Sequence, residues 1–222
     1  MSRQTLWVLG VLALLILPAS PVGAEGTAAD LAAAGEWKRA AKAWQREMVA
    51  LASAPALDSE AAVVAEALVL RAVIEAGRGK DRHADWYWWS AAIFGKRPEL
   101  SELSTIHRDA GTALAGMVQP APPKPKTTRP AHPVAMRSKT ERRPSPSKLK
   151  RAACEGQVGW ASVTVQRDES GHYRAPRALA MQPITVRPLC ALALFEEYRD
   201  TRTPGVTGAV TTLSHELGSP PE

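Results

Sequence analysis

The chain has 222 residues and a formal net charge of +6, from 28 Lys and Arg against 22 Asp and Glu. A charge of this sign is typical of proteins that bind nucleic acid. Here, however, the cations concentrate between Lys124 and Arg151, while the two flanking halves are close to balanced. This distribution argues against a nucleic-acid partner. The length leaves room for two folded segments, each large enough for only a small core.

The first 24 residues have the pattern of a secretory signal peptide. Arg3 supplies a positive charge, residues 6–17 form an apolar run, and Val22 and Ala24 are small residues that predict cleavage between Ala24 and Glu25. The apolar run is shorter than the roughly 20 residues of a membrane span. The alternative is an uncleaved anchor. We therefore expect a periplasmic or secreted protein, anchored in the inner membrane if this segment is retained.

Residues 25–118 are rich in Ala, Leu, Glu, Arg and Lys, which favour helix. Glycines at 35, 77, 79 and 95 and prolines at 55 and 98 separate the periodic stretches. The spacing of the apolar residues predicts a short helix that ends near Gly35 and further helices over 37–48, 60–74, 81–94 and 103–117. The sequence therefore predicts a helical domain.

The segment GEWKRAAKAW, residues 35–44, resembles part of a tetratricopeptide repeat. A small residue at the turn, aromatic residues on either side and Ala at the close crossing of two helices carry the resemblance, in Gly35, Trp37, Ala40 and Trp44. A looser second copy places Gly79, Ala84 and Trp88 at related positions. The resemblance implies helices stacked in pairs, with a groove that can bind a protein or peptide.

Four tryptophans are candidates for contact with such a partner: Trp37, Trp44, Trp88 and Trp160. Among the consecutive aromatic residues 86–89, a helix would put Trp86 and Trp89 on one face and point Trp88 elsewhere. One of them is thus expected to be exposed. The alternative is that the aromatic residues serve only to pack helices against each other.

Residues 119–147 are Pro-rich and basic and contain almost nothing large and apolar. Such a segment cannot bury enough surface to offset its ordering entropy, so it predicts a disordered, extended linker. In the cell envelope its cations could touch a membrane or peptidoglycan surface. The alternative is a linker that is simply solvated.

The C-terminal half alternates in the manner of short strands. Residues 157–166 and 172–180 predict a hairpin around a turn at 168–171, and Pro176 restricts the second strand to an edge. A helix over 189–198 and a last strand over 206–213 are expected to follow. The sequence thus predicts a small sheet with one helix.

This order of elements resembles the C-terminal domain of TonB-type energy-transducing proteins. The matching positions are an acidic-Gly pair, alternating valines, a turn glycine and a strand proline, at Glu155-Gly156, Val158, Val163, Val165, Gly171 and Pro176. The Pro/Lys-rich segment before the domain and the apolar N-terminus also fit the family layout. The chain departs from the family at the end of the helix, where residues 195–200 keep only part of an aromatic run. It also lacks the aromatic-Pro pair that opens the family domain.

Two cysteines, Cys154 and Cys190, lie in this half of the chain. In an oxidising compartment an even pair within one domain predicts a disulfide. The five histidines are scattered, and the motifs of hydrolases, metalloproteases and phosphate-binding loops do not occur. We therefore expect no enzyme, no cofactor and no metal site.

These patterns together predict an α+β protein of the cell envelope. The expected organisation is a signal peptide (1–24), a tetratricopeptide-like helical domain (25–118), a linker (119–147), a TonB-C-like domain (148–215) and a disordered tail (216–222). The expected function is non-enzymatic binding or scaffolding of an envelope protein or peptide. The alternative is a membrane-anchored energy transducer that acts on an outer-membrane receptor.

Overall fold

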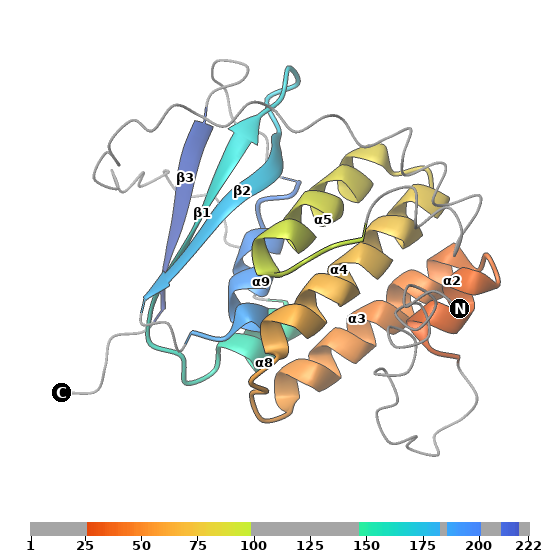
Figure 1. Ribbon diagram of the computed structural model, residues 1–222, viewed down its shortest axis with the longest axis horizontal. Helices are drawn as coiled ribbons and strands as arrows, with labels where there is room; N and C mark the ends of the chain where they lie inside the picture. Colours follow the sequence, from red (N-terminus) through yellow and green to blue (C-terminus); the bar gives the residue numbers. More distant parts are fainter. Residues whose placement is uncertain (1–25, 99–146, 183–185, 201–209, 218–222) are drawn as a thin grey trace, which may run out of the picture.

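The computed structural model describes residues 26–98, 147–182, 186–200 and 210–217. The chain is α+β: helices occupy one side and a small antiparallel sheet the other (Figure 1). The predicted signal peptide with its Ala24–Glu25 cleavage site, the helix over 103–117 and the linker up to residue 146 lie outside the described residues. The elements are α2 (Ala28–Ala33), α3 (Trp37–Ser53), α4 (Glu60–Gly77), α5 (Asp81–Phe94), α8 (Lys148–Cys154), β1 (Gly159–Arg167), β2 (Tyr173–Gln182), α9 (Pro188–Glu196) and β3 (Val210–Leu217).

The four N-terminal helices form two hairpins with the same turn. In α2–α3 the turn glycine, Gly35, has a φ of 73°, and Glu36 N–H donates to the Leu31 carbonyl at 2.8 Å. In α4–α5 the corresponding Gly79 has a φ of 67°, and Lys80 N–H donates to the Glu75 carbonyl at 2.9 Å. Both are Schellman caps, which satisfy the last carbonyls of a helix and favour glycine in the left-handed conformation. The stretches around Gly35 and Gly79, which the sequence analysis matched to each other, thus have the same local structure.

Trp44 holds the two hairpins together. Its indole N–H donates to the Ala67 carbonyl of α4 at 2.7 Å, and its ring meets the edge of Tyr87 of α5 with centroids 6.0 Å apart. The cation of Arg71 lies 4.9 Å from the Trp44 ring and 5.5 Å from the Tyr87 ring. Small residues such as Ala40 and Ala84, both buried, let the helices approach. Aromatic residues and small residues therefore have the packing roles that the spacing suggested.

The sheet has the order β2-β1-β3, and both pairings are antiparallel. Pro176 lies in the edge strand β2, as expected for a residue that cannot donate to a ladder. Around it the register shifts, so that residues 175–177 lie opposite Val165 of β1. β3 ends four residues later than the sequence indicated, and the first four residues of the predicted strand, 206–209, lie outside the described residues. Glu216 and Leu217 consequently belong to the sheet and not to the predicted tail.

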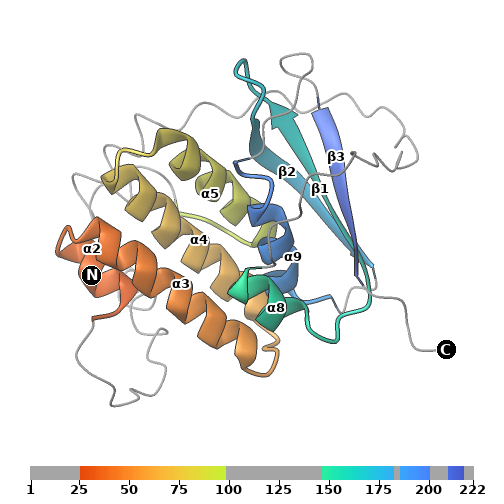
Figure 2. The same ribbon diagram turned by 180° about the vertical axis from the view of Figure 1, so that it is seen from behind.

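Helix α9 lies between the sheet and the helical layer (Figures 1 and 2). All its residues from Leu189 to Phe195 are buried, so it is apolar on every side. It contacts β1 on one side and α4 and α8 on others, while α3 packs on α8 and α5 on β2. The two halves of the chain therefore share one hydrophobic core. The sequence had suggested two separate domains, 25–118 and 148–215, and in the structure the described residues of both contribute to this core.

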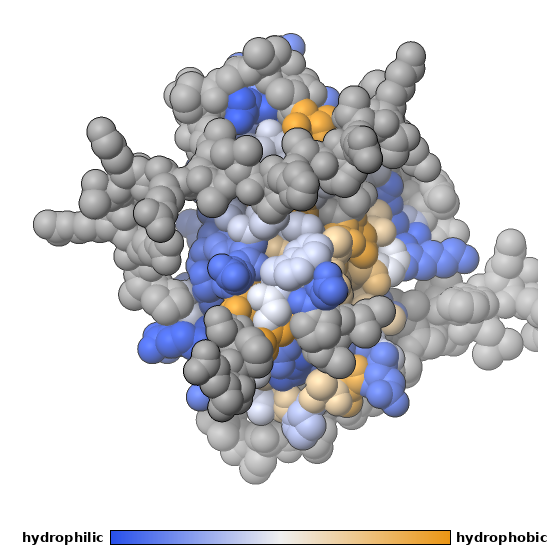
Figure 3. Space-filling model, turned by 90° about the vertical axis from the view of Figure 1, so that its left-hand side faces the viewer, coloured by the Kyte–Doolittle hydropathy of each residue, from blue (hydrophilic) through white to orange (hydrophobic). Residues whose placement is uncertain are grey.

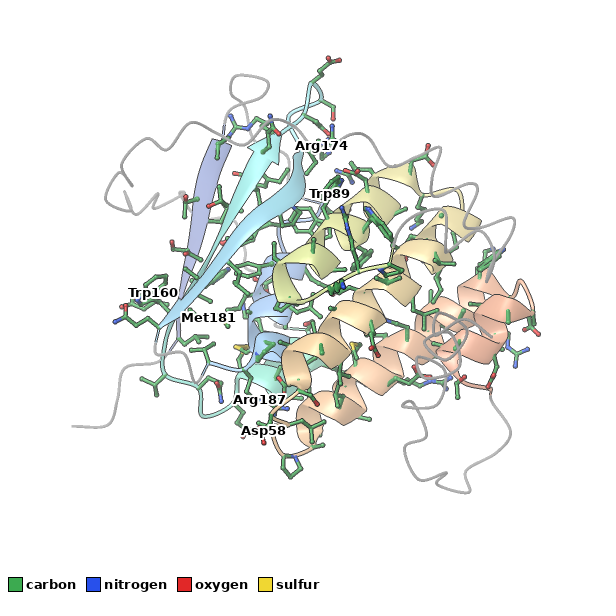
Figure 4. All side chains as sticks on the ribbon, in the orientation of Figure 1. Asp58, Trp89, Trp160, Arg174, Met181 and Arg187 are labelled. Carbon is green, nitrogen blue, oxygen red and sulfur yellow. A yellow bond between two sulfur atoms is a disulfide. The ribbon has the colours of Figure 1, made fainter. Side chains whose placement is uncertain are left out.

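A buried ion pair crosses the junction between the halves. Arg187, just before α9, donates from two of its nitrogens to Glu60 Oε2 at 2.8 and 3.0 Å, with a longer contact to Oε1 at 3.4 Å, and it donates to the Ala52 carbonyl at 2.9 Å. Glu60, the first residue of α4, also accepts from the Leu189 N–H at 3.2 Å. The Glu60 carboxylate is nearly inaccessible to solvent, yet each of its oxygens has a donor. Figure 4 shows Arg187 beside Asp58, at the end of the helical layer where α4 begins.

The structure brings Cys154 and Cys190 to disulfide distance. Their Cα atoms are 4.8 Å apart, and the bond joins the last residue of α8 to the first turn of α9. α8 is capped by Ser147, whose side chain accepts from the Lys150 N–H, so this residue belongs to the helix and not to the linker. The bridge thus fixes α8 to the central helix.

Candidate protein-binding surface

The β3 strand forms an edge of the sheet. In the order β2-β1-β3 it pairs with β1 alone among the described strands. The other edge, β2, packs beside α5, where Arg174 lies 3.4 Å from the Asp85 carboxylate. An edge strand presents backbone N–H and C=O groups that can pair with another strand. Within the part of the chain that the structure describes, β3 is therefore the edge that an added strand can approach.

The face of the sheet that points away from the helices is built from alternate residues of each strand. We call it the outer face; on β1 and β3 it consists of Trp160, Ser162, Thr164, Gln166, Val210, Thr212, Ser214 and Glu216. Trp160 is 38% exposed and Val210 43% exposed, and the residues between them are small and polar. Where the described residues are visible from this side, their surface is mostly hydrophilic or intermediate, with small apolar areas (Figure 3). Trp160 points away from the helical layer (Figure 4).

The opposite face of β3 is tied to the core by an aromatic cluster. His215 Nε2 lies 2.9 Å from the Tyr198 hydroxyl, and the two rings have centroids 5.3 Å apart. Tyr198 in turn meets Tyr173 of β2 edge to face at 6.3 Å. Burial, together with the nearby Glu197 and Tyr173, raises the pKa of Tyr198 above its ordinary value. The edge strand is thus held in place from one side and open on the other.

A polar network connects the end of α9 to α5. The Tyr87 hydroxyl donates to Glu196 at 2.7 Å and accepts from Arg199. Asp200 accepts from Arg199 at 2.6 Å and lies 2.8 Å from His83. Burial and the neighbouring Glu196 charge raise the pKa of Tyr87 well above 10. Its hydroxyl consequently stays protonated and available as a donor.

Glu75 of α4 is the fully buried acid of this region. It pairs with Arg71 at 2.8 Å and with Arg78 at 2.9 Å, and its second oxygen is 3.8 Å from His83. Burial acts to raise the pKa of Glu75, but the neighbouring His83 and the two guanidinium charges outweigh it and lower the pKa below its ordinary value. In Asp200, likewise, burial is outweighed by Arg199 and His83, which lower its pKa. The carboxylates of Glu75 and Asp200 are thus each paired with cations, which is the arrangement of a structural network.

The predicted partner-binding tryptophans do not form one site. Trp44 and Trp88 are each 2% exposed, so they are part of the helical core and offer no surface. Trp37 is half-buried at the far end of the helical layer from Trp160, which alone lies on the sheet. Of residues 86–89, the first three are buried and Trp89 is half-buried. The expectation that Trp88 is the exposed member was wrong.

Sequence reasoning did not identify the buried ionic residues. Arg71 and Glu75 are one helical turn apart on a largely buried helix, and Glu60 opens the same helix. A charged pair at this spacing within an apolar run is a signal that such a pair is buried. Arg187 and Arg199, which bind Glu60 and Tyr87 from the C-terminal half, have no local sequence pattern that indicates burial. They lie more than 100 residues away from the groups that they bind.

The described residues place further limits on the site. Within them, no group of three or more His, Cys, Asp or Glu side chains is arranged to hold a metal ion. In the same part of the chain, no helix combines the length and hydrophobicity that a membrane crossing requires. Comparison of the chain with family models, with curated proteins and with solved structures found no match.

Proposed function

We propose that the protein is a non-enzymatic binding or scaffold protein of the cell envelope, and that it captures an extended polypeptide segment along β3. The observation that carries this proposal is the sheet order, which leaves β3 with one described neighbour. An extended peptide that adds to a sheet edge gains affinity from main-chain hydrogen bonds. Side chains of the peptide that point to the outer face would lie beside Thr212 and Ser214 of β3. These two side chains are too small to block the peptide.

Specificity would come from the two exposed apolar side chains of the outer face. Trp160 faces Glu216 across the β1–β3 ladder, and Val210 is at the other end of β3. The two residues therefore bracket the strand. Tryptophan is also among the residues most often found at the energetic centres of interfaces.

The envelope location rests on the apolar segment at the N-terminus and on the disulfide. Disulfides persist in oxidising compartments such as the periplasm. The tetratricopeptide-like hairpins serve in this proposal as the support for the sheet, because most of their aromatic residues (Trp44, Trp86, Tyr87 and Trp88) are buried in the packing between helices. The TonB resemblance implies the same use of a small sheet. The transducer alternative additionally requires that residues 1–24 are retained as an anchor.

The proposal can be tested with 12-residue peptides selected for binding to the full-length exported protein. Bound peptide should slow amide hydrogen exchange in β3 and leave exchange in α3 unchanged. A version of the peptide N-methylated at alternate residues should lose binding, because it lacks half of the main-chain donors. Trp160→Ala and Val210→Asp should each weaken binding about tenfold or more.

Leu57→Ala is the matched control, because Leu57 is a similarly exposed apolar residue, 49% accessible, on the loop between α3 and α4. It should leave the affinity unchanged. Protection that maps to the helical hairpins while β3 exchanges freely would show that peptide binds elsewhere and would refute the proposal. Equal losses in the Leu57 and Trp160 variants would also contradict it.

A further inference from the structure

The turns of the two helical hairpins together form an open hollow of about 590 Å³. It lies at the N-terminal ends of α3 and α5. This end of the helical layer is far from β3, so the hollow is separate from the sheet edge (Figure 1). Its walls include Trp37 and four cations, Lys38, Arg39, Arg78 and Lys80, against the single carboxylate of Glu36. The hollow is therefore strongly positive for its size.

Two of these cations have no counter-charge. Arg39 pairs with Glu36, and Arg78 pairs with the buried Glu75 at 2.9 Å. Lys38 and Lys80 are both exposed and make no ion pair or hydrogen bond with any described side chain. They come from different hairpins, one from the start of α3 and the other from the residue before α5. Two ammonium groups that line the same hollow and are unpaired within the described residues are suited to hold one anionic group.

Trp37 gives the hollow a flat and fixed aromatic wall. Its ring lies so close to Gly77 of α4 that a Cβ at this position would be 2.4 Å from the indole carbons. Only glycine leaves room for the ring, so the position of Trp37 depends on the residue that it covers. The indole is half-buried and also lines the hollow. An indole held in this way offers a surface on which the C–H groups of a sugar ring can lie.

We propose that this hollow binds a sugar that carries a phosphate or carboxylate group. The sugar ring lies on Trp37, and its anionic group is held between Lys38 and Lys80. Arg39 and Arg78 form the positive rim. A long apolar ligand does not fit this site, because the Trp37 ring is the only large apolar surface among the residues that line it. Phosphorylated sugars and uronic acids share the required chemistry, and the test distinguishes them.

The test uses the full-length protein and isothermal titration with glucose 6-phosphate, glucuronate, glucose and inorganic phosphate. At least one of the two charged sugars should bind more tightly than both glucose and inorganic phosphate. The double variant Lys38→Gln/Lys80→Gln should weaken that binding roughly five- to thirtyfold, as expected for the loss of two exposed charge pairs. The affinity of the unmodified protein should also fall as salt is raised.

The control is Lys42→Gln/Lys96→Gln, which removes two other exposed lysines that do not line the hollow. It should leave the affinity unchanged, and circular dichroism should show that both double variants are folded. Glucose binding as tightly as the charged sugars would overturn the role of the lysines. Inorganic phosphate binding equally well would overturn the role of Trp37. The absence of saturable binding at millimolar concentrations, or equal losses in the two double variants, would overturn the site itself.

Discussion

Replacing Glu60 by Ala should destabilise the whole protein, because it leaves the Arg187 guanidinium buried without its counter-charge. In the structure Arg187 donates twice to Glu60, at 2.8 and 3.0 Å, and the substitution also removes the acceptor of the Leu189 N–H. Removal of one partner of a buried ion pair costs about 3 to 5 kcal/mol. For a domain whose total stability is on the order of 5–15 kcal/mol, this is a large fraction.

The assay is urea denaturation of Glu60→Ala combined with amide hydrogen exchange measured by mass spectrometry. Glu60 is in α4, but the loss should appear equally in the exchange of α4 and of β1, since α9 joins both in one core. Glu36→Ala is the control, because the Glu36–Arg39 pair is exposed and should contribute less than about 1 kcal/mol. Adding Arg187→Ala to the Glu60 variant should recover part of the loss, because no unpaired charge then remains.

Two results would refute this reasoning. The first is a Glu60→Ala midpoint no lower than that of Glu36→Ala, which would mean that the pair is not buried. The second is fast exchange confined to α4 while β1 keeps its protection. In that case the two halves unfold separately and the shared core does not couple them.

Three further changes test other parts of the structure. Cys154→Ser should lower the free energy of unfolding by about 4 kcal/mol, as the chain-entropy model gives for a separation of 36 residues, and in a shared core it should lower the melting of the helical half as well. Thermal denaturation at fixed redox potential measures this, and an unchanged helical half would contradict the coupling. Tyr87→Phe should cost about 1 to 3 kcal/mol in urea denaturation, because Glu196 and Arg199 lose their shared hydroxyl; a loss below about 0.5 kcal/mol would show that the network is solvated. Glu75 has a lowered pKa, so its contribution is present above the unfolded pKa of about 4.3 and is lost as the pH falls through the folded value. Glu75→Gln should therefore flatten the fall in stability as the pH drops below about 4.3, and an unchanged acid limb would argue against this assignment.

Local patterns were enough to predict most elements. The helix over 81–94 agrees with α5 at both ends, because Gly79 and Gly95 flank a continuous run of helix-favouring residues. The disulfide followed from the number of cysteines and the expected compartment. The end of β3 was placed four residues too early, because the local pattern does not fix where this strand stops. Its register is set instead by β1, where Val163 pairs with Leu213 and Ala161 with His215.

The aromatic residues of α5 show where local reasoning fails. A helical wheel separates Trp88 from Trp86 and Trp89, and it assumes that a helix has one buried face. α5 instead packs on α4 and also on β2, so two faces are covered and Trp88 is buried with Trp86 and Tyr87. The second face is covered by a strand about 90 residues later in the chain. The spacing of apolar residues within α5 therefore contains no information on this second buried face.

The sequence of α9 does contain a signal for the joining of the two halves. Residues 188–195, PLCALALF, have no polar position at all, so a helix here needs apolar neighbours on every side. A three-stranded sheet covers one side of such a helix and leaves the others in water. The remaining sides must therefore be covered by other parts of the chain, and in the structure α4 and α8 cover them. A fragment that begins at residue 148 would expose the α4-facing side of α9 and leave Arg187 without Glu60. The C-terminal module therefore depends on the N-terminal helices for its fold, even though its own strands and helix follow one another in a continuous segment.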